Sequence, residues 1–273
     1  MRLRPPDWLV YGAIVAAVLA AALGRRERIA APEPPPPVPG AAQLPLAADS
    51  PFAASAIVPV RRGALRQART AFSVGESGIW VSGGARPCAR PGGVVAGGRA
   101  VPARAGAAVG GLQILTTTGA GTPSLPMAAA RDVRPGELGF HVGYPQDGPG
   151  EVASRLLGTR TLRSMSRTAA NMPVLAWAEI GHTEGLKGAR MGLIGAPVLD
   201  VEGRVVGVTV GQSPRRGRLY TTTPDRLRNA LAAAREPLGA PGPGQPIGAD
   251  NYGRAADDLR RDLRVVQLVC LAR

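Results

Sequence analysis

The stretch Gly192-Leu-Ile-Gly-Ala-Pro-Val-Leu-Asp200, continued by Val201-Glu-Gly-Arg-Val-Val-Gly-Val208, decides the fold prediction for this chain of 273 residues. It consists of an apolar run, a Glu-Gly turn and a second apolar run. Alternating and β-branched residues on both sides of a glycine-containing turn are typical of a β-hairpin. We therefore expect residues 196–210 to form two antiparallel strands.

Other short apolar runs, separated by glycine and proline, extend on both sides of this hairpin. Many short strands at regular spacing, with little helix, are typical of a β-barrel or β-sandwich. Thr223-Pro-Asp225 then supplies an N-cap, a first-turn proline and a first-turn acid, which predict a helix that ends near Pro237. The runs are 70–74, 78–81, 93–95, 112–115, 138–142, 156–157, 174–177 and 219–222.

The hairpin resembles the nucleophile segment of trypsin-like (chymotrypsin-fold) serine proteases, most closely their HtrA-like branch. That family carries Gly-x-Ser-Gly-Gly-Pro-Val/Leu here, and Gly192, Gly195, Pro197 and Val198 match it. The resemblance covers residues 65–235. It implies an all-β fold: a trypsin-like double six-stranded β-barrel with a C-terminal helix, preceded here by an N-terminal transmembrane helix.

The three catalytic positions implied by the resemblance are vacant. The family needs a serine hydroxyl, an imidazole that takes its proton and a carboxylate that orients the imidazole. These positions fall on Ile194, Ala85 and Gly111, none of which can do that chemistry. We therefore expect a protease fold without a catalytic triad and assign no catalytic residue. The alternative is an active HtrA-like serine endopeptidase.

Backbone groups of the former site are the candidate binding groups. The resemblance places an oxyanion hole at the amides of Gly192 and Ile194, beside Gly195. A peptide adding to the strand edge near residues 208–211 would reach it. His182, in a loop before the hairpin, is a further candidate. If Ile194 instead fills the hole, the cleft is closed and the protein is a structural component of the cell envelope.

Metal, cofactor and nucleic-acid functions find little support in the sequence. The chain has two histidines, and His141, in mid-strand, is expected in the core. No Cys/His cluster has metal-ligand spacing, and no glycine loop has a phosphate-binding context. We predict no metal and no cofactor. A net charge of +14 is compatible with nucleic-acid binding, but the arginines are scattered along the chain and aromatic residues make up only 4%. We therefore do not expect nucleic acid as a partner.

Basic residues cluster at the start of the globular part. Arg61, Arg62, Arg66 and Arg69 surround Leu65. This spacing predicts a short helix with a solvated basic face, and a patch that faces the membrane or an acidic partner is the alternative.

The N-terminal segment, residues 8–24, is almost wholly apolar and long enough to cross a bilayer. Trp8 and Tyr11 lie near one end, where interfacial aromatic residues belong. We expect an uncut membrane anchor, with a cleaved signal peptide as the alternative. Because arginines flank both ends, charge does not fix the orientation. The resemblance implies export, and hence a single-pass inner-membrane protein whose globular domain lies in the periplasm.

Composition divides the chain into five segments. Proline-rich and Gly/Pro-rich stretches mark the linkers, and the apolar tail is expected to dock on the body as a short helix and a strand. The segments are a membrane anchor (1–29), a Pro/Ala-rich linker (30–60), the double-barrel domain (61–237), a Gly/Pro linker (238–249) and a C-terminal helix and strand (250–273).

Cys88 and Cys270 are the only cysteines. Two distant cysteines in an exported chain favour one disulfide bond, and two buried thiols are the alternative. Closing so long a loop adds roughly 3 to 5 kcal/mol on the loop-entropy model.

These expectations combine into a function of binding rather than catalysis. An exported protease fold without its triad is expected to act as a binding, scaffold or regulatory component of the cell envelope. Its expected partners are a protein or peptide in the envelope and, through residues 8–24, the membrane. No sequence feature assigns an oligomeric state.

Overall fold

The computed structural model describes residues 12–17, 20, 65–75, 78–84, 88–96, 99–118, 122–128, 133–163, 171–234 and 244–271. Residues 12–17 are helical, but within these ranges no helix is long and apolar enough to cross a membrane. Most of the predicted anchor at 8–24 lies outside the described residues, as do the linker at 30–60 and the first part of the linker at 238–249.

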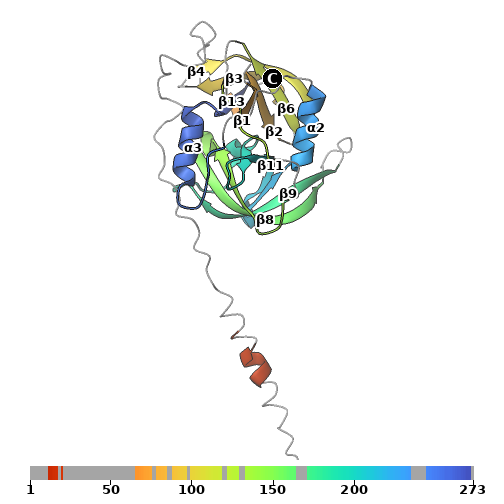
Figure 1. Cartoon of the computed structure of the whole chain (residues 1–273), viewed down its shortest axis with the longest axis vertical. Coiled ribbons are helices and arrows are strands. Elements are labelled where there is room, and N and C mark those ends of the chain that lie inside the picture. Colours follow the sequence, from red (N-terminus) through yellow and green to blue (C-terminus); the bar gives the residue numbers. More distant parts are fainter. Residues whose placement is uncertain are drawn as a thin grey trace, which may run out of the picture. The chain divides into compact units, whose positions relative to one another are not determined.

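The first β-sheet contains seven antiparallel strands in the order β4-β3-β13-β1-β2-β6-β5 (Figure 1). Six of them come from the first half of the globular part, and β13 comes from the end of the chain. The strands are β1 (Leu65–Gly75), β2 (Ile79–Gly83), β3 (Pro91–Ala96), β4 (Arg99–Val101), β5 (Ala103–Val109), β6 (Leu112–Thr117) and β13 (Val265–Leu271).

The C-terminal strand β13 lies inside this sheet rather than on its surface. It pairs with β1 on one side, where Val265 is opposite Phe72, and with β3 on the other. All but the last of its residues are buried. A disulfide bond between Cys88 and Cys270, with Cα atoms 5.6 Å apart, ties β13 to the segment before β3, which confirms the predicted bond. The tail therefore raises the strand number of this sheet from six to seven.

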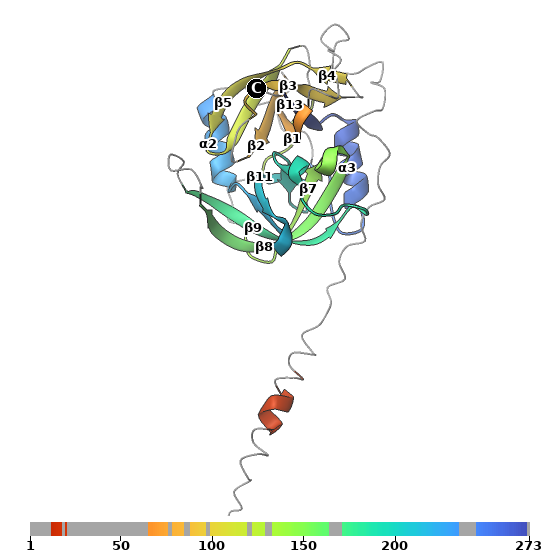
Figure 2. The ribbon, with the colours of Figure 1, turned by 180° about the vertical axis from the view of Figure 1, so that it is seen from behind.

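The second sheet closes into a barrel in the order β10-β11-β12-β9-β8-β7 (Figure 2). The hairpin predicted at 196–210 is present as β10 and β11, in register from Pro197 opposite Val208. The two barrel-like sheets predicted from the sequence are thus both present. The strands are β7 (Leu138–Gly143), β8 (Gly150–Leu162), β9 (Met172–His182), β10 (Pro197–Leu199), β11 (Val205–Ser213) and β12 (Arg218–Thr221).

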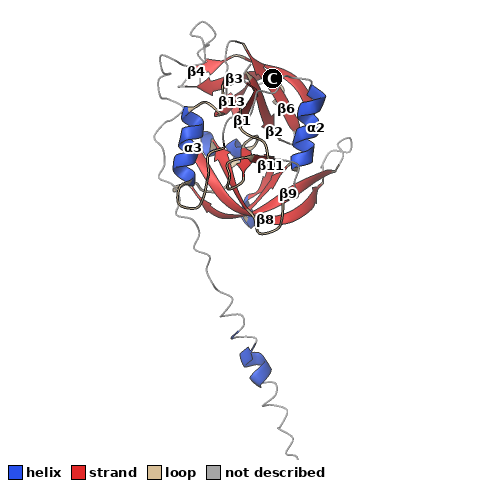
Figure 3. Cartoon of the chain, viewed as in Figure 1, coloured by secondary structure: helices blue, strands red, loops and turns tan. Residues whose placement is uncertain are grey.

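Helices α2 (Pro224–Ala234) and α3 (Tyr252–Arg261) flank the strands (Figure 3). As predicted, Thr223 caps α2: its hydroxyl accepts a hydrogen bond from the Arg226 amide at 3.3 Å. The Arg226 side chain donates to the Gly110 carbonyl at 2.9 Å and so joins α2 to the first sheet. Short 3-10 turns complete the fold: η4 (Pro145–Asp147), η5 (Met191–Leu193) and η6 (Pro214–Arg216).

An apolar core runs through both sheets. Trp80 lies in the first sheet and Trp177 in the second, and both are fully buried. The largest cluster joins Phe72 of β1 to Phe140 of β7 and to Tyr252 of α3, whose ring centroid lies 5.9 Å from that of Phe140. Because one cluster includes side chains of both sheets, apolar packing fixes the sheets against each other.

The helix predicted around Leu65 is wrong, because residues 65–75 form strand β1. The solvated basic face is also wrong for Arg69, which is 8% exposed and donates from Nη1 to the Gly83 carbonyl at 3.3 Å. Pairing with β13 on one side and β2 on the other overrides the local helix signal.

Candidate functional site

The segment that resembles the nucleophile loop of serine proteases is a tight turn that contacts both sheets. Residues Met191–Leu193 form the 3-10 turn η5, and Ile194 follows it with only 7% of its surface exposed. The Ile194 amide donates to the Met191 carbonyl at 3.1 Å. A serine protease needs a nucleophile and a free backbone amide at this position. Ile194 instead has an aliphatic side chain, and its amide is already hydrogen-bonded within the turn.

Gly192 and Gly195, which match the protease motif, lie so close to other backbone segments that no side chain would fit there. A Cβ on Gly192 would lie 1.8 Å from the Tyr144 carbonyl oxygen, and one on Gly195, where φ is +91°, would lie 2.1 Å from the Thr70 carbonyl oxygen. Thr70 of β1 also donates from its hydroxyl to the Gly192 carbonyl at 2.7 Å and from its amide to the Ile194 carbonyl at 3.0 Å. The turn thus joins the second barrel to the first sheet.

These contacts correct one expectation from the sequence. An oxyanion hole needs the amides of Gly192 and Ile194 to point together at a ligand. Here the Ile194 amide is donated to Met191, and the Gly195 amide is donated to the Thr209 carbonyl at 2.8 Å. The structure places Gly192, Ile194 and Gly195 in one turn, but it does not form the predicted two-amide hole.

The other two triad positions offer no catalytic group within the described residues. Gly111 lies in the turn between β5 and β6 with φ at +83°, and its nearest side chain is that of Met172. A Cβ at this position would lie 3.1 Å from the Met172 sulfur. The remaining position, Ala85, lies outside the described residues.

His141 is a core residue, as expected, and its hydrogen bonds exclude a general-base role. It is fully buried on β7, with Nε2 2.9 Å from the Ser154 hydroxyl and Nδ1 3.0 Å from that of Thr209. Ser154 donates its own proton to the Gly139 carbonyl at 2.9 Å, so it accepts from His141 Nε2. Because Nε2 carries the proton in this arrangement, it has no free lone pair with which to accept the Ser154 proton. Burial lowers the pKa of His141 to about 3, so the ring is also a weak base.

His182 contacts a charged cluster that also includes Arg190, the residue before the turn η5. It is the last residue of β9, its side chain is 37% exposed, and its Nδ1 lies 2.7 Å from the Glu179 carboxylate. The same carboxylate oxygen lies 3.0 Å from Nη2 of Arg190, whose side chain is 8% exposed. His182, Glu179 and Arg190 therefore form a small charged cluster on the wall of the barrel.

A cavity of about 270 Å³ opens beside this cluster. Its wall comes from the end of β9, the loop before η5, and the β11–η6–β12 connection. The cavity was not predicted from the sequence, because its charged residues are far apart along the chain. Each of them, taken by itself, looks like an ordinary charged residue of a protein surface. The lining residues are Glu179, Gly188, Arg190, Gln212, Pro214, Gly217, Arg218 and Leu219.

A second cavity, of about 410 Å³, lies beside the β10–β11 turn. It contains Glu137, Asp200 and Glu202, but Arg204 pairs with Asp200 at 2.9 Å and with Glu202 at 2.7 Å. No group of three His, Cys, Asp or Glu residues that could hold a metal ion is present in the described ranges. Arg204 therefore already pairs with two of the three carboxylates at this cavity.

Comparison with solved structures identifies the architecture. The MamO protease domain from Magnetospirillum magneticum is 16% identical, with a TM-score of 0.50 over 66% of this chain and 95% of that chain. An inactive serine-to-alanine mutant of Rv3671c from M. tuberculosis is 19% identical, with a TM-score of 0.49 over 72% and 100% of the two chains. The HtrA-type protease AlgW with a decapeptide is 14% identical, with a TM-score of 0.44 over 59% and 48%.

No protein-family model matches the sequence, and no curated protein matches it. The structural likeness shows that the chain has the trypsin-like serine protease fold that the hairpin motif implied.

Proposed function

We propose that this trypsin-like chain is catalytically inactive and binds an extended protein segment in the cell envelope. The observation that carries the proposal is Ile194, a buried aliphatic residue whose amide is hydrogen-bonded within its own turn. Acyl transfer needs an attacking group and an oxyanion site, and this position supplies neither.

The proposed binding surface is the edge of β11 next to this turn. Strand β10 pairs with β11 only as far as Val208, and Thr209 exchanges backbone hydrogen bonds with Gly195 and Ala196. From residue 210 to Ser213, β11 pairs with β12 on one side and with no described strand on the other. An extended segment can add there through main-chain hydrogen bonds, which require no catalytic group.

Export and membrane attachment form part of the proposal. The disulfide bond between Cys88 and Cys270 is typical of an oxidising compartment. Residues 8–24 would anchor the protein in the inner membrane, with the barrels in the periplasm.

Fluorophosphonate labelling and casein turnover by the purified full chain test the loss of catalysis. Wild type, Ile194→Ala and Ile194→Ser should all be silent, because the serine variant restores a hydroxyl without a base. Labelling of wild type that persists in Ile194→Ala would establish the alternative, an active HtrA-like endopeptidase in which another serine reacts.

Peptide binding is tested by NMR on the isotope-labelled full chain with an extended decapeptide. Amide shifts should change along residues 210–213 and in the adjoining turn at 192–195. Unchanged amide shifts in both places would refute peptide binding and favour the second alternative, a structural envelope protein with a closed cleft.

A further inference from the structure

We propose that the cavity beside Arg190 binds a carboxylate carried by the peptide segment that adds to β11. This inference rests on the proposed function and names the chemistry that the segment must present. The cavity of about 270 Å³ shares Gln212 with the unpaired part of the β11 edge. A side chain of a strand added at that edge can therefore enter the cavity.

The charges that line the cavity favour an anion. Arg190 and Arg218 outnumber Glu179 among the lining residues, and Arg215 and Arg216 are exposed in the adjoining turn η6. Guanidinium groups form charge-assisted hydrogen bonds with carboxylates, often bidentate ones. The cavity thus presents a positive surface to an entering side chain.

Arg190 is fixed in place before any ligand arrives. Its Nη1 donates to the Gly188 carbonyl at 2.7 Å, its Nη2 to Glu179 at 3.0 Å, and its amide to the Gln212 side chain at 2.7 Å. Its Nε is buried without a hydrogen-bond partner. Because Glu179 balances the charge of Arg190, the net positive charge of the cavity lining comes from Arg218.

Arg218 is the residue that can contact the ligand directly. It begins β12, its side chain is half-buried at the cavity, and no described residue forms a hydrogen bond or ion pair with it. A half-buried cation with free donors in a cavity gains more from a carboxylate than a fully exposed one, because less water screens the pair. Arg218 is therefore the expected specificity residue.

The test compares two fluorescein-labelled, C-terminally amidated decapeptides, one with glutamate at alternate positions and one with glutamine. Binding to the full chain is measured by fluorescence anisotropy. Wild type should bind the glutamate peptide roughly tenfold more tightly, as expected for one charge-assisted contact. Arg218→Gln should remove this preference.

Arg104→Gln is the matched control, because Arg104 is an exposed arginine on β5 of the other sheet and its loss changes the net charge equally. The control should keep the tenfold preference. A glutamine peptide with a free C-terminal carboxylate distinguishes the two sources of the anion: tighter binding of this peptide alone would assign the cavity to a chain end. Either carboxylate preference, if lost in Arg218→Gln, supports the proposal.

Two results separate the possible failures. Equal affinity for the glutamate, glutamine and free-acid peptides, or a carboxylate preference that survives in Arg218→Gln, would overturn the carboxylate site and leave peptide binding intact. Absence of binding by all three peptides would overturn the proposed function and the carboxylate site together.

Discussion

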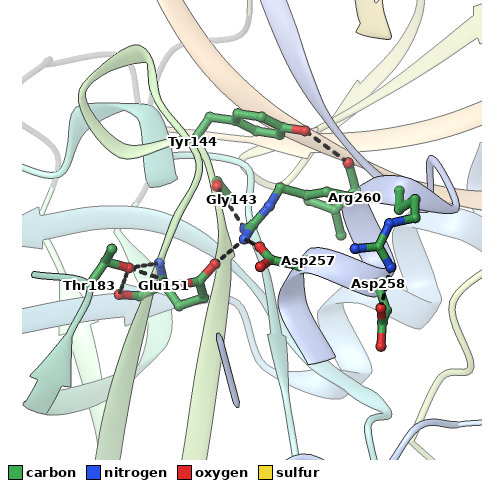
Figure 4. A network of polar contacts seen from close by, with 9 residues as sticks. Gly143, Tyr144, Glu151, Thr183, Asp257, Asp258 and Arg260 are labelled. Carbon is green, nitrogen blue, oxygen red and sulfur yellow. Dashed lines mark hydrogen bonds and ion pairs between the residues drawn. The ribbon is translucent and has the colours of Figure 1, made fainter. Parts of the chain in front are cut away.

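Replacing Arg260 by methionine should destabilise the protein by about 3 to 5 kcal/mol, because the change leaves a buried carboxylate without its counter-ion. The side chains of Arg260 on α3 and Glu151 on β8 are 1% and 3% exposed and form a direct ion pair (Figure 4). Arg260 also pairs with Asp257 and donates to the Gly143 carbonyl at 3.4 Å. Burial alone lowers the pKa of Arg260, but the attractions of Glu151, Tyr144 and Asp257 together outweigh burial, so the pKa is raised and the charge is kept.

Glu151 has one further strong partner, which does not replace the arginine. The Thr183 hydroxyl donates to its carboxylate at 2.8 Å. A neutral hydroxyl satisfies one oxygen but does not balance a buried negative charge. A loss of about 3 to 5 kcal/mol is a large part of the 5 to 15 kcal/mol by which domains are typically stable.

Arg261 provides the matched control on the same helix. It pairs with Asp258 at 2.6 Å, but its side chain is 67% exposed, and exposed ion pairs contribute at most about 1 kcal/mol. Arg261→Met should therefore change the free energy of unfolding by less than about 1 kcal/mol. The double variant Glu151→Gln/Arg260→Met should be more stable than Arg260→Met alone, since no unpaired charge remains buried.

Urea unfolding of the full chain, followed by tryptophan fluorescence, measures these differences. Trp80 and Trp177 are fully buried in the first and second sheets, so the signal reports on both. Equal unfolding free energies for Arg260→Met and Arg261→Met would refute the prediction that losing Arg260 leaves a costly unpaired charge on Glu151.

Three further predictions concern the turn, the buried histidine and the disulfide bond. Gly195→Ala should cost more than about 3 kcal/mol by thermal unfolding, because the new Cβ would lie 2.1 Å from the Thr70 carbonyl oxygen; Gly148→Ala, with nothing within 4 Å, is the control and should cost under about 1 kcal/mol. The folded pKa of His141, about 3, lies below its ordinary value, so the unfolded chain binds the proton first. His141 should therefore lower stability as pH falls from about 6.5 towards 3, by up to about 1.4 kcal/mol per pH unit, and an NMR titration of its ring near pH 6.5 in the folded protein would contradict this. The disulfide bond joins residues separated by 182 positions in the sequence. Reducing it should lower the free energy of unfolding in urea by up to about 5 kcal/mol, and an unchanged unfolding midpoint would contradict this stabilising role.

Local patterns in the sequence predicted the elements that local physics controls. The β10–β11 hairpin follows from alternation around a turn, and the start of α2 follows from the Thr223 cap. The strand β5 gave no such signal, because Ala103–Val109 consists mainly of alanine and glycine and lacks β-branched residues before its end. Its pairing with β6, rather than its own composition, makes it a strand.

Apart from the Cys88–Cys270 bond, which two lone cysteines made predictable, long-range side-chain pairings could not be predicted from the sequence. Arg260 and Glu151 are 109 residues apart, and nothing in either local pattern marks them as partners. The cavity around Arg190 was missed for the same reason, because Glu179 and Arg218 reach it from separate strands. His182 and Glu179 are an i,i+3 pair on β9, and a register shift opposite Ala153 and Ser154 lets both side chains reach the same side of the strand. The local sequence does not mark this irregularity.

The turn at residues 192–197 shows why parts of a protease motif can be required by the fold alone. Gly192 and Gly195 are there because a Cβ at either position would collide with a backbone carbonyl of a neighbouring segment. Pro197 begins β10, where its ring suits the strand entry. The backbone at position 194 requires no particular residue, because Ile194 has ordinary extended dihedral angles. At this position the side chain matters for reactivity and not for the path of the backbone. The matching residues are therefore those that the joint between the two sheets requires, and the residue that differs is the one that only catalysis would require.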